Sequence, residues 1–140
     1  MFKYLKIESG WLYLSYDLDD GIKDIQASYI FTDPVKDLIE AVIELNINNE
    51  SSFEANEEGS EYLFKFKTNK QVLQIDLLFG WGQNKSIISS RSVSIESFNK
   101  NLYDFYNYIQ DDFQNNSFLF EQNYTFPEEQ FIIFSNLIKN

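Results

Sequence analysis

The first third of the chain alternates between apolar and polar positions, the pattern of half-buried β-strands. The alternation runs through residues 2–7 and 11–18, with Ser9 and Gly10 as a break between the two runs. A polar stretch at residues 17–23 predicts a turn, and a third apolar run follows at residues 25–31. We therefore expect a three-stranded meander at the start of the chain.

A helix is predicted directly after this meander. Asp33 followed by Pro34 is typical of a helix start, because Asp can accept from a free backbone N–H and Pro loses no hydrogen bond at the first helical position. Apolar residues then recur at helical spacing: Val35, Leu38, Ile39, Val42 and Leu45. A polar loop is expected at residues 46–52.

From Phe53 the period returns to two, which predicts a second group of strands. The alternating residues are Tyr62, Phe64 and Phe66 in one strand and Leu73, Ile75, Leu77 and Phe79 in the next, with a turn at residues 67–71. A loop carrying Gly80, Trp81 and Gly82 then leads to a serine-rich run at residues 86–94. We expect this run to be a strand with one face in water.

The last third of the chain predicts two helices. The first presents an apolar stripe about 100° wide, formed by Phe98, Leu102, Phe105, Tyr106, Ile109 and Phe113. The second is expected to begin near Pro127, with Glu128 and Glu129 favoured by the helix dipole in its first turn. A short strand is expected at residues 117–120.

Together these elements predict a single α+β domain over residues 1–140. Its core is a mostly antiparallel sheet of about six to seven strands, with one helix inserted after the third strand and two C-terminal helices packed on the sheet. A chain of this length can bury roughly two thirds of its unfolded surface.

The amino-acid composition excludes more kinds of catalytic and metal site than any motif does. The chain has no histidine and no cysteine, so Ser-His-Asp and Cys-His catalysis and the usual zinc ligands are excluded. The formal net charge is −11, with 22 acidic residues against 11 basic ones, which disfavours nucleic acid and anionic membranes as partners. No secretion signal is visible at the start of the sequence. We expect a cytoplasmic protein.

The remaining catalytic and metal candidates fail on spacing. Asp17, Asp19, Asp20 and Asp24 surround Gly21, but as a calcium loop this stretch would need glycine and glutamate where Ile22 and Ser28 stand. Asp76 would be a candidate acid or base if buried, yet it lies opposite the apolar positions of its strand and is expected to face water. A dinucleotide-binding glycine pattern is incomplete, because position 85 is Lys85. We predict no catalytic residue, metal ligand or cofactor.

Two acidic clusters and one tryptophan are the candidate partner-binding residues. The clusters are Asp17, Asp19, Asp20 and Asp24, and Glu54, Glu57, Glu58 and Glu61. Each cluster is either a solvated face or, if the two share one side of the domain with Trp81, an acidic patch with an aromatic anchor suited to a basic protein. Trp81 itself is either exposed on its loop or buried as an anchor.

The segment from residue 29 to residue 79 resembles immunity proteins of bacterial polymorphic and contact-dependent toxin systems. The resemblance lies in the strand leading into Asp33-Pro34, in Asp37-Leu38-Ile39-Glu40-Ala41, and in Glu58-Gly59-Ser60-Glu61-Tyr62 at the start of an aromatic hairpin. It implies a non-enzymatic protein that blocks a cognate toxin by binding it.

We therefore expect a toxin as partner, with a basic nuclease domain as one option. The alternatives are a small carbohydrate-binding or ligand-binding module, a weak carboxylate-based enzyme, and an inhibitor that mimics DNA. The sequence leaves the oligomeric state open.

Overall fold

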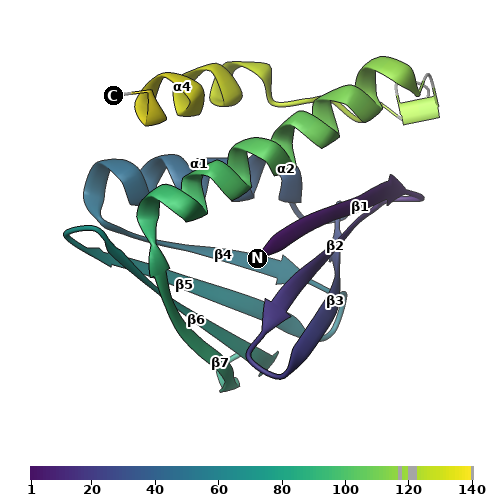
Figure 1. Ribbon diagram of the computed structural model, residues 1–140. Helices are drawn as coiled ribbons and strands as arrows, with labels where there is room; N and C mark the ends of the chain where they lie inside the picture. The colour runs from purple at the N-terminus through teal and green to yellow at the C-terminus, as the bar shows by residue number, and fades with distance from the viewer. Residues whose placement is uncertain (117, 120–122, 140) are drawn as a thin grey trace.

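The structure is a computed structural model that describes residues 1–116, 118–119 and 123–139. It is an α+β fold in which helices cover one side of two β-sheets (Figure 1). The elements follow the chain in the order β1 (Phe2–Glu8), β2 (Trp11–Leu18), β3 (Gly21–Ser28), α1 (Pro34–Asn48), β4 (Glu50–Asn56), β5 (Glu61–Asn69), β6 (Val72–Trp81), β7 (Asn84–Ser94), α2 (Ile95–Asn115) and α4 (Glu128–Ile138).

The strands form two antiparallel sheets instead of the single sheet expected from the sequence. One sheet has the order β1-β2-β3 and the other the order β4-β5-β6-β7. All neighbours within each sheet are consecutive in the chain, and α1 separates the two groups. β3 and β4, which α1 separates in the chain, are not hydrogen-bonded neighbours, and each is an edge strand of its own sheet.

The long helices form where the sequence predicts them because their caps and apolar stripes agree. Asp33 accepts a hydrogen bond from the backbone N–H of Lys36 at 3.1 Å and caps α1. Ser94 caps α2 in the same way, through the N–H of Ser97 at 3.0 Å. The buried residues of α2 are the six of the predicted stripe. The helix expected near Pro127 is also confirmed, as α4.

The two sheets and α2 meet at Phe2. Its ring centroid lies 5.0 Å from that of Tyr16 on β2, 5.0 Å from that of Phe64 on β5 and 6.3 Å from that of Phe98 on α2. All four side chains are almost completely buried. Rings in tilted and edge-on contact of this kind contribute beyond their buried area, so this aromatic cluster joins the layers of the fold.

Several predicted boundaries are wrong. The turn expected at residues 17–23 is confined to Asp19 and Asp20, and the third strand ends at Ser28, before residues 29–31. The loop expected at residues 46–52 instead contains the end of α1 and the start of β4. Gly80 and Trp81 belong to β6.

The short strand expected at residues 117–120 is not formed where the structure describes it. Residues 117 and 120 lie outside the described residues, and Phe118 and Leu119 between them are helical. Among the residues that the structure describes, no helix combines the length and the apolar character needed to cross a membrane.

Candidate functional site

Two hairpin turns lie side by side at one end of the four-stranded sheet, which we call the hairpin end. Asn56 pairs with Glu61 next to the β4–β5 turn, and Trp81 pairs with Asn84 next to the β6–β7 turn. Glu61 is also the register partner of Gly80, which places these two turns side by side. The β2–β3 turn lies elsewhere, beside the middle of β7, because the backbone carbonyl of Asp17 accepts a hydrogen bond from Arg91, seven residues beyond Asn84 in β7.

A chain of aromatic rings crosses the hairpin end and finishes at Trp81. The ring centroids of Tyr62 and Phe79 are 4.6 Å apart, and those of Phe79 and Trp81 are 5.6 Å apart. Tyr62 is buried, whereas Trp81 is 61% exposed. Trp81 is thus an exposed ring held at the edge of the core, and of the two possibilities left open by the sequence the structure shows the exposed one.

The two predicted acidic clusters approach each other around Lys23. The ammonium group of Lys23 lies 5.6 Å from the ring centroid of Tyr62. The pKa of Lys23 is raised, first by its hydrogen bond to Tyr62 and further by the charges of Glu57 and Asp24. Glu57 also accepts a hydrogen bond from the backbone N–H of Gln26 at 3.3 Å. One acid from each cluster is therefore close to the same lysine.

Not all of the predicted acids are free negative charges. The carboxylate of Asp17 binds the N-terminal ammonium group, and the carboxylate of Glu61 lies 2.8 Å from the ammonium of Lys85. Glu54 is hydrogen-bonded to Glu61, which raises the pKa of Glu54 and lowers that of Glu61. Asp19, Asp20, Asp24 and Glu58 are exposed. The two predicted clusters are thus less negative than a count of their carboxylates suggests.

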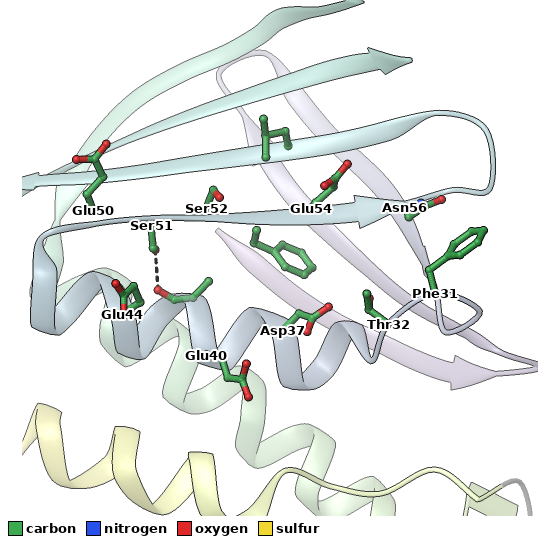
Figure 2. A pocket seen from close by; sticks show the side chains of 13 residues that line it. Phe31, Thr32, Asp37, Glu40, Glu44, Glu50, Ser51, Ser52, Glu54 and Asn56 are labelled. Carbon is green, nitrogen blue, oxygen red and sulfur yellow. Dashed lines mark hydrogen bonds between the residues drawn. The ribbon is translucent and has the colours of Figure 1, made fainter. Parts of the chain in front are cut away.

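A second acidic feature, the acidic groove, lies between α1 and β4 (Figure 2). It has a volume of about 730 Å³, within the range of roughly 300–1,000 Å³ that is usual for ligand sites. Its lining contains five carboxylates and, within the described part of the chain, no lysine or arginine. The lining residues are Phe31, Thr32, Asp37, Glu40, Ala41, Glu44, Glu50, Ser51, Ser52, Phe53, Glu54, Asn56 and Leu63.

Local structure explains how the walls of the groove are held. The Ser51 hydroxyl donates to the carbonyl of Ala41 at 2.6 Å and fixes β4 against α1, as the dashed line in Figure 2 shows. Glu44 accepts a hydrogen bond from the Asn48 side chain at 2.6 Å. Phe31 follows β3 and lies at one end of the groove, with 67% of its surface exposed. The groove therefore combines negative charge with one exposed aromatic ring.

Four of these five acids were not among the residues predicted from the sequence, although a signal for them exists. Asp37, Glu40 and Glu44 are spaced three and four residues apart, so they lie along one side of α1. Glu50 and Glu54 alternate with buried positions of β4. Glu54 was predicted, and it lines the groove while it contacts Glu61 of the hairpin end. It connects the two acidic features.

Asp76, the candidate acid or base, lies on the solvent side of the four-stranded sheet. Its carboxylate accepts hydrogen bonds from Ser90 at 2.6 Å and from Gln74 at 3.0 Å. These bonds hold the pKa of Asp76 below its usual value, chiefly through Ser90. A carboxylate stabilised in its charged form is a weak general acid.

The acids of the described residues are also too dispersed for metal binding. In residues 1–116, 118–119 and 123–139, no three Asp, Glu, His or Cys side chains converge closely enough to hold a metal ion. Comparison of the chain with protein-family models, with curated proteins and with solved structures gives no match.

Proposed function

We propose that this protein is a non-enzymatic binding protein of the immunity type, which neutralises a basic toxin by direct contact. The observation that carries the proposal is the acidic groove, whose described lining residues include five carboxylates and no basic side chain. Of these five, Glu40 has a partial counter-charge from Lys36 at 3.9 Å, with both side chains about half exposed. Surface pairs of this kind contribute little, so the groove keeps its negative potential.

The spread of the acids favours a protein partner. A small cation needs several ligands around one point, whereas the carboxylates of the groove are distributed along a helix and a strand. Distributed negative charge matches the lysine and arginine side chains of a basic protein surface. At low salt, such complementary charges raise the association rate constant well above the value of about 10⁵–10⁶ M⁻¹s⁻¹ that is usual without them.

Two exposed aromatic residues supply the apolar contacts that charge alone does not provide. Phe31 lies at one end of the groove, and Trp81 lies at the hairpin end. Aromatic side chains are enriched among the residues that dominate binding energy at interfaces, where surrounding polar contacts exclude water. The proposed interface therefore has an acidic centre in the groove and extends through Glu54 to Trp81.

The test uses the C-terminal domain of the protein encoded by the adjoining upstream gene, which the proposal predicts to be a toxin. Its association rate is measured with the wild type, with the groove variant Glu44→Lys/Glu54→Lys, and with the control variant Asp104→Lys/Asp111→Lys. The control changes the net charge equally, at exposed positions on α2 outside the groove. We expect the groove variant to associate at least tenfold more slowly at low salt and the control to stay near the wild-type rate.

The salt dependence and the toxicity complete the experiment. Raising the ionic strength from about 0.01 M to 0.15 M shortens the screening length from about 30 Å to about 8 Å, so the wild-type rate should fall towards that of the groove variant. Co-expression of the wild type should protect cells from the toxin domain. Absence of binding and of protection would contradict the proposed function. Equal rates for the two variants would show that the groove is not the binding surface.

A further inference from the structure

Among the residues that the structure describes, no strand pairs with the outer edge of β4. Asn49 accepts a hydrogen bond from the N–H of Thr68, and the N–H of Glu57 donates to Ser60. Both pairs continue the β4–β5 register, in which paired residues alternate between hydrogen-bonded and non-hydrogen-bonded. The odd-numbered residues of β4 therefore bond to β5. The N–H and C=O groups of Ser52 and Glu54 point away from β5, towards the acidic groove.

This edge is regular, unlike the other edge of the same sheet. The β4–β5 pairing has an unbroken register, whereas the β6–β7 pairing shifts between Leu77 and Leu78. A bulge of that kind protects an edge strand against the addition of another strand. No such irregularity protects β4, which therefore keeps the geometry needed to pair with an added strand.

The acidic groove extends around the β4 edge and reaches both faces of the strand. Its lining includes Leu63, on the solvent side of the sheet, and Ala41, on the side of the helix. Figure 2 shows the side chains of Glu50 and Glu54 pointing away from α1, while Asp37 and Glu44 project from the helix on the other side. A strand added at this edge would have carboxylates on both of its faces.

We propose that an extended segment of the partner, bearing lysine or arginine at neighbouring positions, adds to β4 as a fifth strand of the sheet. The inference rests on the proposed function and specifies how the partner is bound. The open part of the edge is residues 50–54, because Glu57, just beyond the end of β4, already contacts β3. At about 3.4 Å per residue this part is about 17 Å long.

Charge complementarity identifies the occupant. Successive side chains of a strand point to opposite faces, so one residue of the added segment faces Glu50 and Glu54 while the next faces Asp37 and Glu44. Both kinds of position therefore favour a basic side chain. A residue near Phe31, at the end of the groove, favours an apolar side chain. Main-chain bonds to β4 give affinity in this mode, and side chains give specificity.

The test uses the full-length protein and a fluorescently labelled octapeptide, two repeats of Lys-Arg-Val-Thr, as the probe. A second peptide of the same charge is N-methylated at its two central amides. Neighbouring N–H groups of a strand point to opposite sides, so in any register one methyl group must face β4. Fluorescence anisotropy should show at least tenfold weaker binding of the methylated peptide to the wild type.

A protein variant tests the same contact from the other side. The N–H of Ser52 is not used by β5, and an edge strand tolerates proline at such a position. We expect Ser52→Pro to bind the unmodified peptide at least tenfold more weakly than its matched control, Ser52→Ala, with circular dichroism verifying that both are folded. If Ser52→Pro does not fold, strand addition is still tested by comparing how the two peptides bind to the wild type.

The contrary results are distinct from failure of the proposed function. Equal binding of the two peptides would show that charge alone holds the segment, and no binding of the unmodified peptide would also overturn strand addition. In either case the toxin domain can still bind and its association rate can still depend on Glu44 and Glu54. The proposed function itself fails only if the protein neither binds the toxin domain nor protects cells from it.

Discussion

Arg91, the only arginine in the chain, donates a hydrogen bond from Nη1 to the backbone carbonyl of Asp17 at 2.8 Å. Arg91 is on β7 and Asp17 is on β2, so this bond links the two sheets. The positive charge of Arg91 also acts on Tyr16. Burial raises the pKa of the Tyr16 hydroxyl to about 12, and Arg91 opposes part of this rise. The arginine thus has a structural role close to one of the predicted acidic clusters.

The Arg91→Met variant should be less stable by about 1–2 kcal/mol, because the half-buried carbonyl of Asp17 loses a charged donor. Urea unfolding monitored by circular dichroism measures the change. Lys100→Met, at an exposed position of α2, is the matched control and should change stability by less than about 0.5 kcal/mol. A similar loss in both variants would show that the bond between the sheets contributes nothing specific.

Phe64 should be among the most sensitive positions of the core. Its ring packs against those of Phe2, Tyr16, Phe53 and Phe66, with centroid distances from 5.0 to 6.2 Å. Phe64→Ala leaves a cavity where strands of both sheets meet and should reduce the free energy of unfolding by about 3–5 kcal/mol. Tyr108→Ala, at an exposed aromatic residue of α2, should have almost no effect. Urea midpoints compare the two.

The helices could be predicted from the sequence because several local signals agree. For α1, the Asp33-Pro34 start and the spacing of Val35, Leu38 and Ile39 point to the same element. For α2, a single apolar stripe over about four turns leaves no competing periodicity. These signals depend on residues close in the chain. They do not depend on how strands pair.

The division into two sheets could not be predicted, because it depends on which strand edges meet across α1. The error at residues 46–52 has a more local cause. Asn49 adopts a left-handed conformation with φ of 67° and ends α1 in a single residue, so β4 can begin at Glu50. The polar residues Glu50 and Ser52 suggested a loop, but they form the exposed face of an edge strand. For this reason the β4 wall of the acidic groove could not be predicted.

The stability contributed by Asp33 should depend on pH in an unusual direction. Burial raises the pKa of Asp33 above its usual value of 3.8, even though its carboxylate caps α1. Because the folded-state pKa is the higher one, the contribution is fully present below the unfolded-state pKa and is lost as the pH rises through the raised folded-state pKa. Wild-type stability should therefore decline over this window relative to that of a variant that does not titrate.

Asp33→Asn is that variant, since its side-chain carbonyl can still accept the N–H of Lys36. The free energy of unfolding of Asp33→Asn, measured from pH 3 to pH 7, should increase relative to that of the wild type as the pH rises. Asp33→Ala loses the cap and should cost about 1 kcal/mol. A wild-type curve parallel to that of Asp33→Asn would contradict the effect of burial on this carboxyl group.

Trp81 offers a test that separates binding from stability. Its side chain is 61% exposed and contacts the ring of Phe79, so Trp81→Ala should change the free energy of unfolding by no more than about 0.5 kcal/mol. If Trp81 is an anchor of the proposed interface, the same variant should bind the toxin domain at least tenfold more weakly, a loss of about 1.4 kcal/mol. Tyr108→Ala removes a similarly exposed aromatic ring from α2 and should bind the toxin domain as the wild type does.

Tryptophan fluorescence tests the same contact directly. In a Trp11→Phe background, where Trp81 is the only tryptophan, toxin binding should shift its fluorescence emission to shorter wavelength, because the ring leaves water. An unchanged emission together with unchanged affinity of Trp81→Ala would exclude the hairpin end from the interface and leave the acidic groove as its centre.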